Sequence, residues 1–425
     1  MAHGILRAMM PPIARQGRFG PLLIFAVVLL VVISVLSAIA LGETAEATAN
    51  SSTQTTVFTV SATDLGGFAT DPPTVESPAA ILIHADSGKV LYERNAEKQR
   101  RMASTTKIMT GILILETMDL GTSVTVSEKA AQTIEPKTWL REGDVLTVEQ
   151  LLYALMLRSA NSAAVALAEA CSGSVEEFAA LMNDKAAELG MEDTHFINPN
   201  GLDATGHYST AADMAMVARY AMKNDKFREL VSTESYTVSL PGRSEPTVFK
   251  NTNKLLGRVS WVTGIKTGLT PKAEQCLVGS ASKNGVTVIS VVLGQPSSSV
   301  CFSESQALLE YGLAQYKHVT LMEEGVAVAE TTVPHQLDGG LQLVTESAVE
   351  MDLYKDDEVT ASVSLDGPAV LPVRAGDVYG SVALMVDGET VKTVDLVANK
   401  SIGKTTLGSK LSHYWDRLAR WLGAG

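Results

Sequence analysis

Ser104 and Lys107 form a serine–lysine pair whose spacing suits nucleophilic catalysis. They lie three residues apart at the predicted start of an apolar helix, so their side chains share one face. A serine hydroxyl is a weak nucleophile until a base takes its proton, and a lysine can be that base only where burial or another cation lowers its pKa. The apolar run 111–115 predicts that this helix is buried. The same spacing recurs at Ser280–Lys283 and Ser401–Lys404, so the pair alone does not identify a site.

Two further short motifs lie downstream of this pair. Ser159–Ala160–Asn161 occupies a predicted break between helices, and Lys266–Thr267–Gly268 lies on a predicted strand. A second S-x-N occurs at 282–284, whereas Lys-Thr-Gly occurs once. The ordered set S-x-x-K, S-x-N and K-T-G, on helix, loop and strand, is the signature of serine penicillin-binding proteins and β-lactamases. The sequence therefore predicts one serine-nucleophile site assembled from three distant segments.

The residue types in these motifs could activate a serine and hold a peptide. Lys266 beside the first lysine would lower the pKa of one amine, which could then act as a base. Ser159 could relay a proton to a leaving nitrogen, and Asn161 could both donate to and accept from a substrate amide. At the end of an edge strand, Gly268 would let an extended peptide approach closely. Thr267 adds a hydroxyl for a terminal carboxylate.

Length, composition and charge limit the possible classes of protein. The chain has 425 residues, 46% of them hydrophobic, with a net charge of −13 and a pI near 5.1. This length permits two domains, and the acidic balance argues against a nucleic-acid partner, which requires a basic face. The three cysteines have no metal-ligand spacing and the seven histidines include no H-E-x-x-H or H-x-H pattern. We therefore expect no metal and no cofactor.

The N-terminal segment predicts export. Arg7, Arg15 and Arg18 precede a charge-free apolar run at 21–41. Basic residues before such a run place the N-terminus in the cytoplasm and the following chain outside. Residues 1–41 are therefore either a signal peptide or an N-terminal membrane anchor. Residues 42–77 are rich in Ala, Thr, Ser and Glu, which predicts a flexible linker.

The ordered part of the chain divides into two predicted domains. Residues 78–318 combine strands near both ends with helices between them, which predicts an α+β domain with an antiparallel sheet. Residues 319–403 contain short alternating runs bounded by Asp-Gly turns, which predicts a small β-sandwich-like domain. The strands of the first domain are expected at 79–85, 89–94, 236–240, 260–269, 276–282 and 286–293, and its helices from Ser104 and at 149–157, 163–170, 178–189, 211–222 and 303–316.

The last 22 residues, 404–425, predict an amphipathic helix. Four Leu residues and Trp415 recur at helical spacing with Trp421 alongside, and basic residues such as Arg417 and Arg420 occupy the other side. A basic, Trp-bearing helix suits an anionic membrane surface. The alternative is a helix packed on the β domain or on a partner.

The chain from about 76 to 316 resembles the low-molecular-mass penicillin-binding proteins that act as D-alanyl-D-alanine carboxypeptidases, peptidase family S11. The resemblance covers the motifs with their flanks and further segments at 189–191, 194–196, 198–203 and 207–211, while 372–376 with Gly380 resembles that family's small C-terminal β domain. It implies a serine β-lactamase/transpeptidase-like α+β fold with a helical subdomain, followed by the small all-β domain. It also implies a terminal amphipathic helix that anchors the enzyme to the outer face of the cytoplasmic membrane.

The resemblance also implies a role for each motif residue. Ser104 would be the acylated nucleophile, Lys107 its base, and Thr267 the group that holds the terminal carboxylate. The backbone N–H groups of Ser104 and Leu269 would form the oxyanion hole. The remaining members of the proton path and substrate clamp would be Ser159, Asn161, Lys266 and Gly268.

Four positions depart from the usual pattern of this family. Met102 stands where Pro is usual and Ser162 where Asp is frequent. Ala273–Glu274 replaces a common Ala-Gly, and Leu269 replaces an aromatic residue or histidine. None of these removes a reacting group. Since Leu269 and Glu274 border the substrate strand, they bear on substrate preference rather than on mechanism.

The expected function is removal of the terminal D-alanine from peptidoglycan stem peptides through an acyl-serine intermediate, with β-lactams acylating the same serine. A class A-like β-lactamase is disfavoured because the segment 193–203 has no glutamate to drive deacylation. Endopeptidase action on cross-links uses the same machinery and stays open. A catalytically silent wall-binding scaffold is disfavoured by the intact motifs. A Ser-His-Asp triad using His207 and Asp203 is disfavoured because no G-x-S-x-G occurs.

Overall fold

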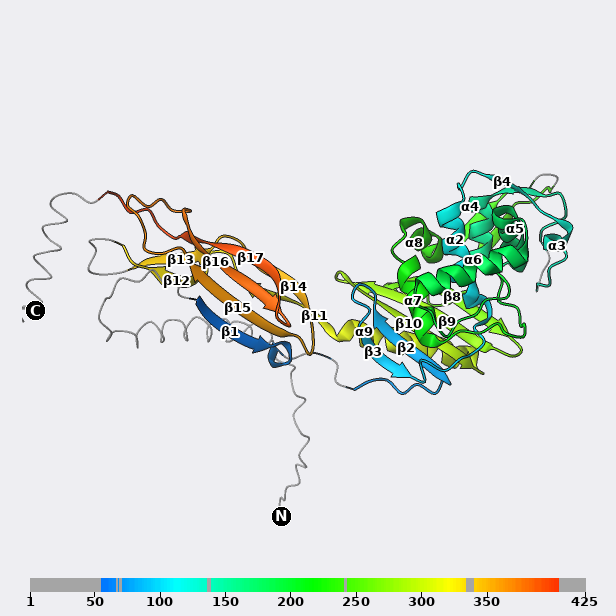
Figure 1. The fold of residues 1–425 in the computed structure, drawn as a ribbon, viewed down its shortest axis with the longest axis horizontal. Coiled ribbons are helices and arrows are strands. Elements are labelled where there is room, and N and C mark those ends of the chain that lie inside the picture. Colours follow the sequence, from blue (N-terminus) through cyan, green and yellow to red (C-terminus); the bar gives the residue numbers. More distant parts are fainter. Residues whose placement is uncertain are drawn as a thin grey trace, which may run out of the picture. The chain divides into compact units, whose positions relative to one another are not determined.

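The computed structural model describes residues 55–65, 68, 71–135, 139–240, 243–333 and 340–404. Its residues form two compact units, one spanning Phe68–Tyr316 and the other combining residues 55–65 with the described residues from Lys317 to Lys404 (Figure 1). The predicted segment 1–41 and nearly all of the predicted helix 404–425 lie outside the described residues. No helix of the described ranges is long and apolar enough to span a membrane.

A five-stranded antiparallel sheet forms the centre of the unit Phe68–Tyr316 (Figure 1). The inner strands read as almost continuous apolar runs because both faces of the sheet are covered. The last strand in the order, β8, is an edge strand, so one of its sides is free to pair with a ligand. The order is β3 (Val90–Arg94), β2 (Ala79–His84), β10 (Val286–Gln295), β9 (Glu274–Lys283) and β8 (Val262–Thr270).

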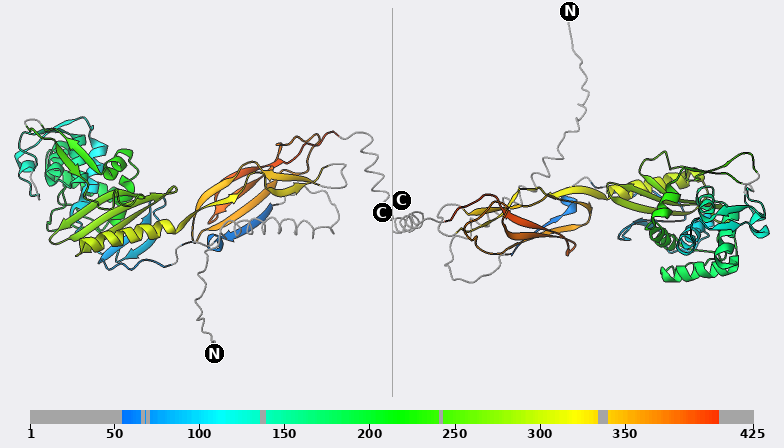
Figure 2. Two further views of the ribbon diagram at one scale, coloured as in Figure 1. Left: turned by 180° about the vertical axis from the view of Figure 1, so that it is seen from behind. Right: turned by 90° about the horizontal axis from the view of Figure 1, so that it is seen from above.

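Helices cover both faces of this sheet. Figure 2 shows α9 (Ser298–Ala314) lying along one face, where Leu308 and Leu309 pack on Leu82 and Val288. The other face carries a helical subdomain around a large apolar core. The helices of this subdomain are α2 (Lys107–Thr117), α3 (Glu128–Ala131), α4 (Val148–Leu157), α5 (Asn161–Ser172), α6 (Val175–Glu188), α7 (Ala211–Ala221) and α8 (Asp225–Ser232), with the two-stranded sheets β4 (Ser123–Thr125)–β5 (Val145–Thr147) and β6 (Ser235–Val238)–β7 (Thr247–Lys250).

The predicted helix from Ser104 begins differently in the structure. A 3-10 turn, η2 (Ala103–Thr106), contains Ser104, and the α-helix starts only at Lys107. Ala103, the first residue of this turn, has a positive φ of 48°, which lies outside the right-handed helical region, so no regular helix extends back through it. The serine and the lysine nevertheless meet, since residues three apart also lie close together along a 3-10 turn.

The second unit is all-β, as expected, and its sheets form a small sandwich. A six-stranded sheet packs against the pair β11–β14 through Leu321, Val349, Leu384 and Val394. The six strands are β1 (Thr55–Ser61), β15 (Glu358–Leu365), β16 (Val378–Val386), β17 (Glu389–Ala398), β13 (Leu341–Thr345) and β12 (Ala327–Thr331), and the pair is β11 (Tyr316–Met322) with β14 (Val349–Tyr354).

The linker prediction for 42–77 is wrong for residues 55–65. Thr55–Ser61 forms β1, which pairs antiparallel with β15 along its whole length, and a short 3-10 helix, η1 (Ala62–Leu65), follows. The segment is rich in Thr and Val with one Phe, residue types that favour strands, and it completes the edge of the six-stranded sheet. The average composition of residues 42–77 is polar, so the prediction for the whole segment missed this short strand.

Candidate active site

The Lys107 ammonium nitrogen stands at the centre of a buried hydrogen-bond cluster. Its Nζ lies 2.9 Å from Ser104 Oγ and 2.8 Å from Asn161 Oδ1, and it also donates to the backbone oxygen of Asn200. The side chain is fully buried at the start of α2. The structure thus brings together the first serine, the first lysine and the asparagine of S-x-N, as the sequence predicts.

The chemistry of the three partners fits a lysine that exchanges a proton with Ser104. Asn161 Oδ1 and the Asn200 carbonyl oxygen can only accept, whereas a serine hydroxyl can accept or donate. A charged Lys107 donates one N–H to each partner. A neutral Lys107 keeps the two acceptors on its remaining hydrogens, and its lone pair then faces the Ser104 hydroxyl. The cluster therefore accommodates both states with no rearrangement of heavy atoms.

The surroundings of Lys107 favour its neutral state. Burial lowers its pKa well below the usual value, the nearby Lys266 ammonium lowers it further, and the Glu135 carboxylate partly opposes both. Lys266 is itself buried on β8, and burial lowers its pKa from 10.5 to about 7. Two buried amines within electrostatic range of each other are an arrangement that can yield a base near neutral pH.

Strand β8, which carries Lys266, Thr267 and Gly268, packs against the 3-10 turn η2 that contains Ser104. Lys266 Nζ donates to the backbone oxygen of Thr267 at 3.1 Å, and Thr267 Oγ1 lies 2.6 Å from Thr252 Oγ1. A Cβ added to Gly268 would come within 3.0 Å of the Ser104 nitrogen and of the Met102 oxygen. The missing side chain at Gly268 therefore allows the edge strand to lie directly against η2.

Ser159 occupies the turn between α4 and α5 and adopts a positive φ of 62°. Such a conformation costs a non-glycine residue on the order of 1–2 kcal/mol. Strained backbone of this kind clusters at functional sites, which is an independent reason to consider Ser159. The next residue, Ala160, is the N-cap of α5, and Asn161 is the first residue of that helix.

Two groups of the site were absent from the sequence-based set of residues. One is the backbone oxygen of Asn200, which accepts from Lys107 Nζ and lies 3.5 Å from Ser104 Oγ. The turn-forming residues at 198–203 predict a loop there, but every residue has a backbone carbonyl group, so the sequence does not indicate which one takes part in the site. The other is Glu135, for which the sequence gives no signal, since it lies in a loop far from the three motifs.

Gly201 holds the Asn200 carbonyl in place, and its substitution tests this. The φ of Gly201 is 82°, and a Cβ there would lie 1.9 Å from the Ala103 oxygen. We expect Gly201→Ala to displace the loop and to lower the acylation rate of Ser104 by roughly 100-fold or more. Gly173→Ala is the matched control, because its φ is 83° but its Cβ would meet nothing within 4 Å. Equal acylation rates in the two variants, measured with a fluorescent penicillin, would contradict this role.

His207 and Asp203 do not form a triad with Ser104. His207 Nδ1 accepts from the Ile197 N–H, so Nε2 carries the proton and donates to Thr106 Oγ1 at 3.0 Å. Burial lowers the pKa of His207 to about 4, which keeps the ring neutral. Asp203 accepts from Thr270 Oγ1 instead. Both residues support the turn beside the site, as expected from the sequence.

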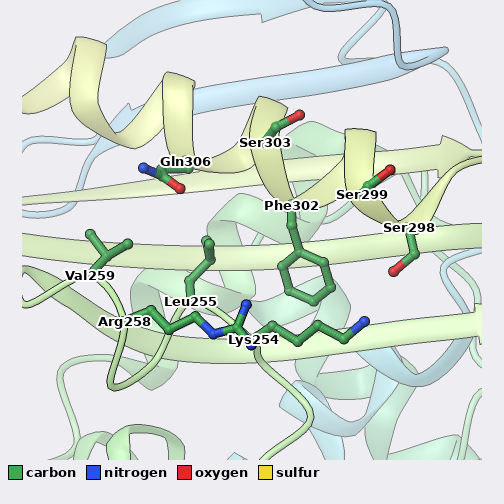
Figure 3. Close-up of a pocket in the computed structure, with 9 residues that line it drawn as sticks. All are labelled: Lys254, Leu255, Arg258, Val259, Ser298, Ser299, Phe302, Ser303 and Gln306. Carbon is green, nitrogen blue, oxygen red and sulfur yellow. The ribbon is translucent and has the colours of Figure 1, made fainter.

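A groove of about 570 Å³ lies elsewhere in the same unit, between α9 and the loop that follows β7 (Figure 3). Phe302 points from α9 toward Leu255 and Lys254, and Lys254 Nζ is 5.5 Å from the centre of the Phe302 ring. The groove includes none of the motif residues and no nucleophile–base pair. The candidate chemistry therefore belongs to the Lys107 cluster.

Comparisons with known proteins agree with this geometry. The family model described as D-alanyl-D-alanine carboxypeptidase matches residues 67–297, and that of the penicillin-binding protein 5 C-terminal domain matches residues 316–404. The carboxypeptidase DacF of Bacillus subtilis is 33% identical over 338 residues, covering 77% of this chain and 86% of its own. The D-alanyl-D-alanine carboxypeptidase of Streptomyces sp. strain K15 is 36% identical over 258 residues, covering 57% and 89%.

Solved structures show the same relationship. Penicillin-binding protein 5 from Haemophilus influenzae superposes with a TM-score of 0.57 at 28% identity, covering 79% of this chain and all of that one. The Streptomyces K15 DD-transpeptidase superposes with a TM-score of 0.56 at 35% identity, covering 58% of this chain and all of that one. Together with the buried serine–lysine cluster on a transpeptidase-like fold, these matches show that the chain belongs to the D-alanyl-D-alanine carboxypeptidase family of serine penicillin-binding proteins.

Proposed function

We propose that this chain is a serine D-alanyl-D-alanine carboxypeptidase that removes the terminal D-alanine of peptidoglycan stem peptides. The observation that carries this function is the contact of the buried Lys107 Nζ with the partly buried Ser104 Oγ, at 2.9 Å, among acceptors that suit a neutral amine. The family membership supplies the substrate class, and β-lactams are the expected covalent inhibitors of the same serine.

The acylation step follows from the cluster. Neutral Lys107 takes the proton of Ser104 as Oγ forms a bond to the carbonyl carbon of the scissile peptide. The backbone N–H groups of Ser104 and Leu269 then stabilise the oxyanion. When the carbon–nitrogen bond breaks, the proton passes from Lys107 through the Ser159 hydroxyl to the departing amine of D-alanine. This leaves an ester on Ser104.

Deacylation repeats the same proton transfers with water as the nucleophile. Water gives its proton to Lys107 as its oxygen attacks the ester carbon, and the proton then returns to Ser104 Oγ as the carbon–oxygen bond breaks. In this proposal the Thr267 hydroxyl and the Lys266 ammonium, both carried by β8, hold the terminal carboxylate of the substrate. Asn161 Nδ2 retains one N–H for a substrate carbonyl.

Location and membrane attachment are part of this proposal. The apolar segment at 21–41 supports export, and the Trp-bearing basic pattern at 404–425 supports binding to the outer face of the cytoplasmic membrane.

Covalent labelling tests the proposal. We expect a fluorescent penicillin to label the full-length protein at one site, and Ser104→Ala to lose both labelling and D-alanine release. Ser401→Ala is the matched control, because Ser401 also precedes a lysine by three residues but lies in the β domain. D-alanine release by Ser104→Ala at the wild-type rate would refute the mechanism, and rapid penicillin turnover would indicate a β-lactamase.

A further inference from the structure

The N-terminus of α5 takes its cap from a distant loop. The N-cap residue is Ala160, whose side chain cannot accept a hydrogen bond. Glu135 supplies the acceptor instead: its Oε2 receives the Asn161 N–H at 3.0 Å, with the Ser162 N–H at a longer 3.5 Å. Its Oε1 accepts the Ser162 hydroxyl proton at 2.9 Å. A carboxylate here also complements the positive end of the helix dipole.

The same loop holds the side chain of Asn161. Its Nδ2 donates to the Ile134 backbone oxygen at 2.7 Å, while its Oδ1 accepts from Lys107 Nζ at 2.8 Å. Ile134 and Glu135 thus bind the Asn161 side chain and backbone, respectively. The position of one acceptor on the catalytic base is therefore set by a segment outside the three motifs.

We propose that Glu135 is a positioning residue for acylation, which holds Asn161 against Lys107 and places a negative charge near the base. This inference rests on the proposed function and adds to it. Ser162 supports this role of Glu135, because its hydroxyl can donate a hydrogen bond to the Glu135 carboxylate. An ionised aspartate, the residue frequent at this position in the family, could only repel it.

The positioning role predicts a measurable change in the pKa of Lys107. Burial and the Lys266 ammonium lower the pKa of Lys107, and the Glu135 carboxylate raises it. His207, which also lies near, stays neutral because burial lowers its pKa to about 4. The Arg158 guanidinium lies within electrostatic range of the same carboxylate. Removing the charge of Glu135 therefore lowers the pKa of Lys107 further.

A direct catalytic role for Glu135 is distinguishable from positioning. Both carboxylate oxygens of Glu135 accept hydrogen bonds from the first residues of α5, which is the contact pattern of a helix cap. A residue that activated the deacylating water would affect loss of the acyl group and leave acylation unchanged. A positioning residue affects acylation and its pH dependence.

The experiment compares Glu135→Gln, Glu135→Ala and Glu142→Gln in the full-length protein. Glu142 is an exposed control seven residues further along the chain. Glutamine can still accept from the Asn161 N–H and donate to Ser162, so we expect acylation within about threefold of wild type at the optimum, with the acid limb of the pH profile at lower pH. We expect Glu135→Ala to acylate roughly 10- to 100-fold more slowly.

The outcomes separate this inference from the proposed function. If wild type forms no adduct at Ser104, the proposed function fails. If wild type is acylated but Glu135→Ala and Glu142→Gln match it in rate and pH profile, only the positioning role is overturned. A loss confined to deacylation would also overturn it, in favour of a catalytic base. Should Glu135→Ala prove unfolded by circular dichroism, the pH profile of Glu135→Gln decides.

Discussion

Replacing Lys107 by methionine is expected to slow acylation of Ser104 by roughly 10²- to 10⁴-fold, the range that a general base contributes. Methionine fills a similar volume, so the buried start of α2 stays packed, but no lone pair remains to take the proton of Ser104. The adduct formed by a fluorescent penicillin, followed by rapid quench and confirmed by mass spectrometry, measures the rate.

Lys283→Met is the control for this variant. Lys283 also follows a serine by three residues, but it is exposed at the end of β9. We expect wild-type acylation rates from it. In the wild type, the rate should rise with pH as Lys107 loses its proton, and burial with the Lys266 charge places that rise well below the usual pKa of a lysine. A Lys107→Met variant that retained this pH-dependent rise would show that another group is the base.

Replacing Lys266 by methionine is expected to stabilise the protein while slowing acylation. Burial lowers the pKa of Lys266 from 10.5 to about 7, and each unit corresponds to about 1.4 kcal/mol, so its charged form costs on the order of a few kcal/mol in the folded state. Methionine removes that cost. The loss of a neighbouring positive charge also raises the pKa of Lys107, so the acid limb of the acylation profile moves to higher pH.

The stability gain has a definite dependence on pH. Below pH 7 both the folded and the unfolded wild type carry the Lys266 proton, so the full cost is present. Between pH 7 and 10.5 the folded state has lost the proton and the unfolded state keeps it, so the wild type becomes more stable as the pH rises. We therefore expect the advantage of Lys266→Met to be largest below pH 7 and to shrink toward zero near pH 10.5.

Calorimetry across this pH range, with Lys272→Met as the control, measures the effect. Lys272 is exposed in the turn after β8, so its removal should change the melting temperature little at any pH. A melting temperature for Lys266→Met that lay below that of the wild type throughout would show that Lys266 is not a buried cation with a lowered pKa.

The motif residues could be identified from the sequence because each motif carries its chemistry in side chains. Ser104, Lys107 and Asn161 were expected to meet, and they lie within hydrogen-bond distance of the same nitrogen. The strands at 79–85 and 286–293 were also expected, and they pair as β2 and β10. Alternating or continuous apolar runs are local signals, which is why both strands could be located without the fold.

Other parts of the site and fold depend on contacts between distant segments, which no local sequence pattern predicts. Asn200 contributes a backbone oxygen, which every residue type possesses, so nothing in the sequence distinguishes it. Glu135 caps a helix whose own N-cap is Ala160, and that pairing exists only once the loop is folded against α5. The strand Thr55–Ser61 lies in a segment of low complexity, so its composition did not indicate a strand. It forms because its backbone pairs with β15.

The sequence by itself determined which reacting groups are present and that they arise from three distant segments. Only the tertiary structure decided their state, because the pKa of an amine depends on burial and on neighbouring charge rather than on residue type. Lys107 and Lys266 have the same side chain as the exposed Lys283, and what makes them chemically different is that the sheet and the helical subdomain enclose them together.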